Sequence, residues 1–178
     1  MLNALQRALI KKFNKALSDF ITKEKYLYFY NASERAMAHR LALYLQAYFP
    51  KHYVDCEYNL NLENKQTLRK EIILASREAT LYNKRVRAID EEGIAVSVFP
   101  DIIVHQRGEN SHNKIIIEIK KNNSSVDSSY DKLKLKKYTS NCSFKYDLGI
   151  FLCIKIGNHS ILEDFQIEYW SNGKPIQK

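Results

Sequence analysis

The sequence predicts a single α/β domain, and three observations lead to this prediction. The chain has 178 residues, the length of one ordinary domain. Hydrophobic residues make up 45% of it, enough to bury a core without disulfides or a structural metal. Segments with the spacing of helices and runs rich in β-forming residues occur together along the chain. We therefore treat residues 1–178 as one domain with a mixed core.

Two helices are expected near the N-terminus. Apolar residues recur every three or four positions from Leu2 to about Ile21, so residues 1–24 are predicted to form an amphipathic helix. Ser33 is a favourable N-cap for a second helix that runs to about Tyr48. The helix at residues 1–24 is expected to be an extra N-terminal element, and the second helix to belong to the central set of helices and strands.

The remainder of the chain predicts strands around one further helix. Residues 61–92 form a polar insertion, in which Leu68, Ile72, Ala75 and Ala79 favour a helix. Alternation and β-branched residues predict the strands, and a basic segment predicts the helix. The strands are expected at Tyr53–Asn59, Ala95–His105, Lys114–Lys120, Asp147–Ile156 and Phe165–Trp170, and the helix at about Asp127–Thr139.

Composition narrows the classes of function. The formal net charge is +8, which favours a polyanionic partner. The three cysteines form no CxxC pair and the histidines show no zinc-binding spacing, so a disulfide frame or a zinc enzyme is not expected. No apolar run approaches the length of a membrane span, and the first residues carry charge every few positions. A cytoplasmic protein with no membrane partner is expected.

The most informative stretch runs from Val98 to Lys121 and predicts an antiparallel hairpin. If Asp101 pairs with Glu118, the turn centres in the polar segment Gly108–Ser111, where turn residues gather. The same register places Ile103 opposite Ile116, a favourable apolar pair. The two carboxylates then lie on one face of the hairpin, with their Cβ atoms roughly 5 Å apart.

Two facing carboxylates destabilise a hairpin unless a cation lies between them or one is protonated. Lys120 is two residues beyond Glu118 and therefore projects from the same face as Asp101. Mg²⁺ is commonly held by one or two carboxylates together with substrate phosphate, so a hard-cation site would explain this arrangement. The alternative is that Asp101, Glu118 and Lys120 are exposed on a solvent-facing strand.

Pro100-Asp101 followed by Glu118-Ile119-Lys120 resembles the signature of the PD-(D/E)xK nuclease superfamily. The resemblance implies a restriction-endonuclease-like fold, whose core order is helix, three strands, helix, strand. The predicted elements between residues 33 and 156 follow this order, with residues 61–92 as an insertion. Most of the chain is covered by the resemblance.

The resemblance also implies roles for individual residues. Asp101, Glu118 and the carbonyl of Ile119 would bind Mg²⁺, for which Mn²⁺ could substitute. Lys120 would serve the hydrolytic water. Many members of the superfamily add a glutamate from the first core helix, and Glu34 occupies the matching position; as a first-turn residue it also has a structural explanation, because it interacts favourably with the helix dipole.

Other residues are weaker candidates. Glu57 is a reserve acid that shares a strand face with Asp55, and His105 falls on the face of Asp101. Basic residues on and before the last predicted helix could meet phosphates, and two of its tyrosines could contact nucleic acid. These residues are Lys121, Lys132, Lys136, Tyr130 and Tyr138.

Three functions follow from these patterns. The leading one is a Mg²⁺-dependent endodeoxyribonuclease, whose partner is DNA, with RNA open as an alternative and a homodimer allowed. The second is a nucleic-acid-binding protein that keeps the nuclease fold with little or no catalysis. The third is an interaction protein in which the helix at residues 1–24 docks a partner or a second copy.

Overall fold

The computed structural model describes residues 2–63, 66–74, 88–90, 93–140, 144–157 and 165–176. Its main sheet has six strands in the order β1-β7-β8-β9-β10-β11. The neighbours β8 and β9 are parallel and all the other neighbours are antiparallel. The strands of this sheet are β1 (Tyr53–Cys56), β7 (Ile102–His105), β8 (Ile115–Lys121), β9 (Leu148–Ile154), β10 (Gln166–Ser171) and β11 (Lys174–Pro175).

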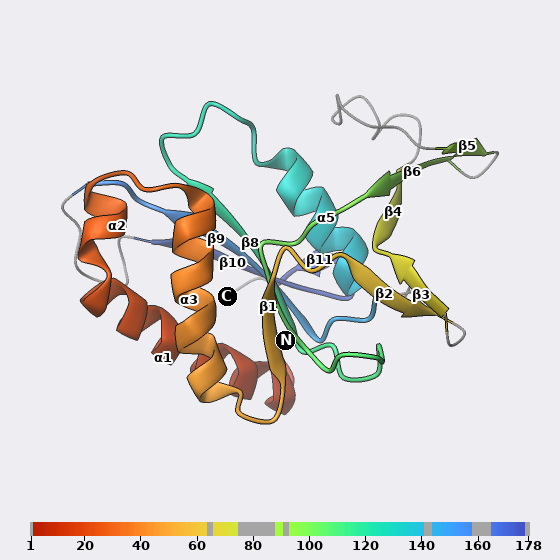
Figure 1. Cartoon of the computed structure of the whole chain (residues 1–178), viewed down its shortest axis with the longest axis horizontal. Coiled ribbons are helices and arrows are strands. Elements are labelled where there is room, and N and C mark those ends of the chain that lie inside the picture. The colour runs from red at the N-terminus through yellow and green to blue at the C-terminus, as the bar shows by residue number, and fades with distance from the viewer. Residues whose placement is uncertain are drawn as a thin grey trace.

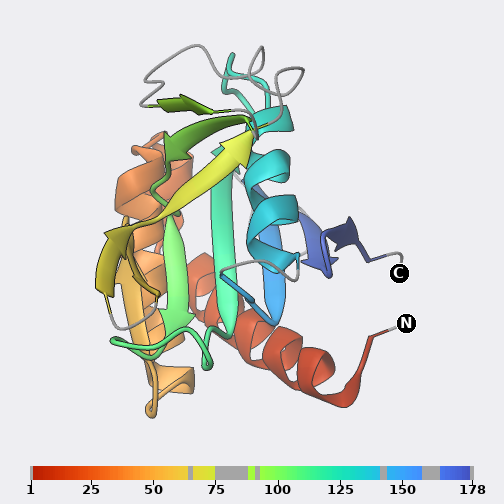
Figure 2. The ribbon, with the colours of Figure 1, turned by 90° about the vertical axis from the view of Figure 1, so that its right-hand side faces the viewer.

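Helices cover both faces of the main sheet (Figures 1 and 2). Helices α1 (Ala4–Lys23) and α3 (Glu34–Tyr48) pack on one face, with the short α2 (Lys25–Phe29) between them. Helix α5 (Ser129–Thr139) packs on the other face. The chain is therefore a mixed α/β protein, and two apolar clusters lie on either side of one sheet.

Helix α1 belongs to the core. A capping box at Asn3 and Gln6 begins it, and most of its apolar face is buried against α3 and the sheet, with Phe13, Leu17 and Phe20 at 0% exposure. Leu5 on the same helix is 46% exposed, and the interaction-protein alternative stays a prediction. No helix among the described residues is both long enough and apolar enough to cross a bilayer.

The predicted hairpin and the offset of its strands are confirmed, although Asp101 lies just before β7 and does not form a ladder pair with Glu118. Strands β7 and β8 are antiparallel, and Ile103 pairs with Ile116. Helix α5 then forms the crossover that a parallel β8–β9 pair requires. It approaches β9 closely at Gly149, where an added Cβ would lie 2.9 Å from Thr139 Cγ2.

Residues 61–92 differ from the prediction. The segment that favours a helix instead contains β3 (Gln66–Arg69) and β4 (Glu71–Leu74), while Ala75 and Ala79 lie outside the described residues. Strand β3 pairs with β2 (Leu60–Glu63), and β4 pairs with β6 (Gly93–Ser97), which also pairs with β5 (Ala88–Asp90). These two small sheets extend away from α1–α3 (Figure 1). Tertiary pairing overrides a weak helical pattern here.

Two predicted strands are shorter than expected. The run Ala95–His105 is divided, because β6 joins a small sheet and β7 joins the main one. Pro100 lies in the break and cannot donate a ladder hydrogen bond. Strand β1 ends at Cys56, where Glu57 takes a left-handed φ of 50°. The two breaks lie next to each other, because Glu57 N donates a hydrogen bond of 3.0 Å to Pro100 O. Asp101 is the residue that follows Pro100.

Candidate active site at the end of β8

Strand β8 extends beyond its partner β7. The last ladder pair joins Ile102 and Ile117, whereas β8 continues to Lys121. Two backbone N–H groups beyond that pair donate to carboxylates: Ile119 N to Asp101 Oδ2 at 2.6 Å and Lys121 N to Glu34 Oε1 at 2.9 Å. The early end of β7 thus leaves donors that two acidic side chains satisfy. The structure brings Asp101 and Glu34 to the same strand, although they are 67 positions apart in sequence.

Glu118 lies under helix α5. It is 1% exposed, and its Oε2 accepts a hydrogen bond of 2.5 Å from Lys134 Nζ. Its other oxygen, Oε1, is buried and has no hydrogen-bond partner among the described residues. A buried carboxylate oxygen without a partner is costly, so the pairing with Lys134 satisfies only part of this side chain.

Lys120 and Lys134 are joined by Asp131. Lys134 Nζ lies 3.1 Å from Asp131 Oδ1, and Lys120 Nζ lies 3.5 Å from Asp131 Oδ2. The side chains of both lysines and of Asp131 are 10–14% exposed. We call Asp101, Glu118, Lys120, Asp131 and Lys134 the β8 cluster. It holds three carboxylates against two ammonium groups.

The pKa values of the β8 cluster reflect buried negative charge. Burial raises the pKa of Asp101 to about 6, against the hydrogen bond from Ile119 and the charge of Lys134. Burial also raises the pKa of Glu118, with the charge of Lys134 opposing and that of Asp101 adding. Burial lowers the pKa of Lys134, but Glu118 and Asp131 outweigh it and the net shift is upward. The cluster therefore retains protons more strongly than its separate groups would.

The donor chemistry of the β8 cluster suits a hard divalent cation. Its acceptors are carboxylate oxygens, the ligands that Mg²⁺ prefers, and Glu118 Oε1 has a lone pair that no described group uses. The present geometry is not a closed metal cage, since no three acidic, histidine or cysteine side chains of the described ranges converge in that way. Lys134 supplies the positive charge at Glu118 instead.

The other predicted site residues lie outside the β8 cluster. Glu57 forms an ion pair with Arg35 at 2.6 Å. Lys121 Nζ donates to Asn31 and Ala32, and Lys132 pairs with Glu168 at 2.7 Å. Lys136 is exposed on α5.

Tyr138 is fully buried on α5, so the structure contradicts its suggested contact with nucleic acid. Its ring packs edge-on against Phe144. Tyr130 on the same helix lies under Lys134, whose Nζ is 5.5 Å from the ring centroid. The two tyrosines therefore support the β8 cluster from the side of the helix.

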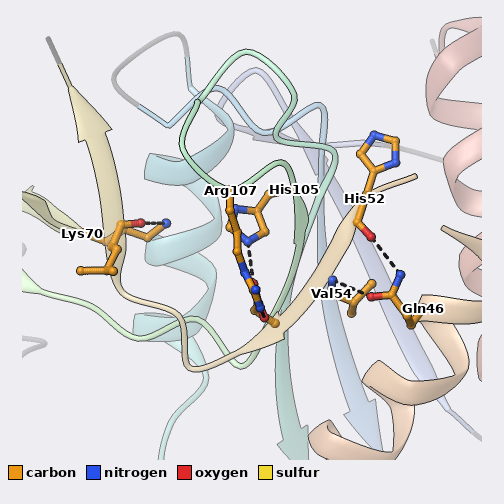
Figure 3. A network of polar contacts seen from close by, with 8 residues as sticks. Gln46, His52, Val54, Lys70, His105 and Arg107 are labelled. Atoms are coloured by element: carbon orange, nitrogen blue, oxygen red, sulfur yellow. Dashed lines mark hydrogen bonds and ion pairs between the residues drawn. The ribbon is translucent and has the colours of Figure 1, made fainter. Parts of the chain in front are cut away.

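A second polar cluster surrounds Asp55 on β1. His105 Nε2 lies 2.9 Å from Asp55 Oδ2, and the Arg107 guanidinium donates to both oxygens of the same carboxylate. Figure 3 shows the side chains of His105 and Arg107 together beside β1. Burial alone would raise the pKa of Asp55, but the hydrogen bonds from Arg107 and His105 lower it. Asp55 is therefore a fully compensated carboxylate.

Lys70 is a buried cation near the Asp55 cluster, by which we mean Asp55, His105 and Arg107. It is 2% exposed, its ammonium donates to Leu60 O, and it lies 4.9 Å from the centroid of the Tyr58 ring. Burial lowers its pKa to about 8. Figure 3 shows it apart from His105 and Arg107, on the segment that leads into β4.

Comparison with protein-family models, with curated proteins and with solved structures found no match for this chain. The contacts of the β8 cluster are therefore the basis for assigning a function. The sequence pattern did not indicate Asp131 and Lys134 as part of that cluster. Their spacing of three residues, which places two side chains on one helix face, was the available signal.

Proposed function

We propose that the protein is a divalent-metal-dependent nuclease that hydrolyses phosphodiester bonds of DNA. The observation that carries the proposal is the arrangement at the end of β8. Asp101 and Glu34 accept from the N–H groups of Ile119 and Lys121, beyond the last ladder pair with β7. Glu118 on the same strand has one buried oxygen without a partner among the described residues. Buried carboxylates that keep raised pKa values are a feature of functional sites.

The order of the elements supports the same proposal. Helix α3 is followed in the main sheet by the antiparallel strands β1, β7 and β8, then by α5 and the parallel strand β9. This is the helix, three strands, helix, strand order that the restriction-endonuclease-like fold implies, with β2–β6 inserted after β1. Asp101 precedes the second of these strands and Glu118 lies on the third.

Each residue has a distinct proposed task. Asp101, Glu118 and the carbonyl of Ile119 would hold Mg²⁺ or Mn²⁺, and the metal would lower the pKa of a water and neutralise phosphodiester charge. Lys120 would orient the attacking water and stabilise charge on the phosphorane oxygens. Glu34 keeps the end of β8 in place through Lys121 N. Asp131 holds Lys120 on the side of the carboxylates.

A nicking assay tests this proposal. Supercoiled plasmid and oligonucleotides, including RNA, are incubated with the protein in Mg²⁺, Mn²⁺ or EDTA. The wild type should cleave only with metal, and Lys120→Ala should lower the rate roughly 100-fold or more, because it removes charge stabilisation in the transition state. Lys51→Ala is the matched control, because Lys51 is an exposed lysine in the turn between α3 and β1 and has no proposed role. An unchanged nicking rate for Lys120→Ala would contradict the proposed role of Lys120 in the mechanism.

A second candidate is a DNA-binding protein with the same fold and no catalysis. The observation that favours it is the Lys134–Glu118 contact, because an ammonium group neutralises the carboxylate that the metal would need. This candidate predicts DNA affinity that falls steeply with salt, no need for metal, and equal or tighter binding by Asp101→Ala. Absence of cleavage of every DNA and RNA form, with retained binding, would select it.

A further inference from the structure

Three exposed aromatic side chains gather around helix α2. Tyr26 is 76% exposed, Tyr30 68% and Phe29 48%. The rings of Tyr26 and Tyr30 are stacked, with centroids 5.5 Å apart and planes within 11° of parallel. Phe29 meets Tyr30 edge-on at 4.9 Å. We call these three residues the α2 platform. Large aromatic side chains are normally used to fill cores and interfaces, so three in contact at the surface indicate a binding face.

The α2 platform is held firmly by its own helix. Tyr28, on the opposite side of α2, is 1% exposed, donates to Ile21 O at 2.8 Å and packs edge-on against Phe165. Gly157 N also donates to Tyr28 O. One tyrosine of the helix thus anchors it to the core while its neighbours stay outside. The three rings are therefore exposed on a helix that is itself fixed to the core.

Contacts link the α2 platform to the end of β8, one residue beyond Lys120 of the β8 cluster. Asn31 follows Tyr30 with a left-handed φ of 56°, and its Oδ1 accepts from Lys121 Nζ at 2.9 Å. Lys121 is the last residue of β8, and its backbone N donates to Glu34. The ammonium of Lys121 contacts Asn31, and Lys25 is an exposed lysine next to Tyr26 in the sequence. Positive charge and exposed aromatic rings therefore occur together on the segment that contacts the end of β8.

We propose that the α2 platform stacks unpaired bases of a single-stranded DNA segment next to the site of cleavage. The proposal rests on the proposed nuclease function and adds the class of substrate. Flat π-faces with adjacent lysines are the combination that binds single strands, because the rings stack on bases of any sequence and the cations meet phosphates. A closed duplex offers its bases only inside the stack, so the substrate has a single-stranded, frayed or flapped portion.

The test measures binding in EDTA, where no cleavage occurs. Fluorescence anisotropy compares the wild type, Tyr26→Ala/Tyr30→Ala and Tyr26→Phe/Tyr30→Phe on a single-stranded oligonucleotide, the same strand with abasic sites, and its duplex. The alanine pair should lose roughly tenfold or more in affinity for the intact single strand, given the usual worth of one or two stacked bases. It should lose little on the abasic strand or the duplex. The phenylalanine pair keeps both rings and should bind like the wild type.

Other outcomes overturn the inference. Equal losses on intact and abasic strands would mean that the rings do not contact bases. Unchanged DNA binding with an altered sedimentation coefficient would assign the platform to a second copy of the chain. If the double alanine variant has a lower melting temperature, the single variant Tyr26→Ala, at the most exposed ring, replaces it. It should show the same loss of affinity for the intact single strand and little loss for the abasic strand or the duplex. Because binding is measured without metal, failure here is separate from failure to nick DNA.

Discussion

Two polar clusters lie on the same face of the main sheet, and the pKa values of their carboxylates are shifted in opposite directions. Asp55 accepts from both His105 and Arg107, and its pKa is lowered. Asp101 and Glu118 have raised pKa values, and Glu118 keeps an unpartnered oxygen. The sequence places acidic and basic residues in both regions, so charge type alone does not separate them.

The difference lies in the balance of charge under burial. In the Asp55 cluster the cations equal or exceed the single carboxylate, and Arg107 remains half-exposed at 52%. In the β8 cluster Glu118 and Asp131 form the ion pairs with Lys134 and Lys120, and Asp101 adds a third carboxylate that has no ion pair among the described residues. Unpaired buried negative charge lowers the stability of the folded state, so a purely structural network is expected to avoid it. The same excess charge favours the binding of a cation. This difference is the basis for our proposal that the β8 cluster, and not the Asp55 cluster, is the functional site.

The largest expected effect comes from removing one cation from each cluster. Lys134→Met leaves buried carboxylates without their partner and should lower the free energy of unfolding by about 3 kcal/mol. Arg107→Met removes a half-exposed partner and should cost about 1 kcal/mol or less. Urea unfolding in EDTA and in saturating Mn²⁺ measures both. Mn²⁺ should restore part of the Lys134→Met loss and none of the Arg107→Met loss, and equal behaviour of the two variants would erase the distinction.

A smaller effect concerns pH and has opposite signs in the two clusters. The folded-state pKa of Asp101 is about 6 against an ordinary 3.8, so the folded protein binds this proton more tightly than the unfolded chain. Stability should therefore fall by about 2 kcal/mol as pH rises from about 4 to about 6, relative to Asp101→Asn. The lowered pKa of Asp55 gives stability that is present above pH 4 and lost below it.

Unfolding curves across pH 2–8 for the wild type, Asp101→Asn and Asp55→Asn measure these two contributions. Saturating Mg²⁺ should flatten the Asp101 contribution, because a bound cation favours the ionised carboxylate. The Asp55 contribution should not respond to Mg²⁺. A Mg²⁺ response at Asp55, or the same sign of pH dependence at both residues, would contradict the comparison.

The smallest effect is on the salt dependence of DNA binding. If DNA crosses the β8 cluster, exposed Lys136 on α5 meets a phosphate, and Lys136→Ala should lower the slope of log affinity against log salt by about 0.9. Arg107→Ala should leave the slope unchanged, since Arg107 is engaged by Asp55. Anisotropy titrations at several salt concentrations provide both slopes. The reverse ranking would move the DNA path to the Asp55 cluster.

Much of the central hairpin could be predicted from the sequence. Alternation, the position of the polar turn and the pairing of Ile103 with Ile116 all follow from period-two geometry, and the structure confirms the pairing. The pairing within one hairpin depends only on residues close together in the sequence, so a few residues determine its register. The resemblance implied only that Glu34 could belong to the site, and its hydrogen bond with Lys121 N was not predicted because it depends on how α3 lies along β8.

The remaining partners could not be predicted, for reasons of packing. Helix α5 carries lysines on several sides, so its sequence has little amphipathic contrast and does not show which lysine is buried. The rotation that brings Lys134 over Glu118 depends on how α5 packs on the sheet, including its close approach to β9 at Gly149. The strands within residues 60–97 depend likewise on pairing between distant segments, which a helical pattern of four residues cannot reveal.

The central claim is that the β8 cluster is a cation site whose charge Lys134 supplies in the metal's absence. Crystals of the protein soaked in Mn²⁺ and measured for anomalous scattering test it most directly. We predict a peak between Asp101 and Glu118, with Lys134 Nζ moved away from Glu118 and still near Asp131. No peak at saturating Mn²⁺, with Lys134 unmoved on Glu118, would contradict the claim.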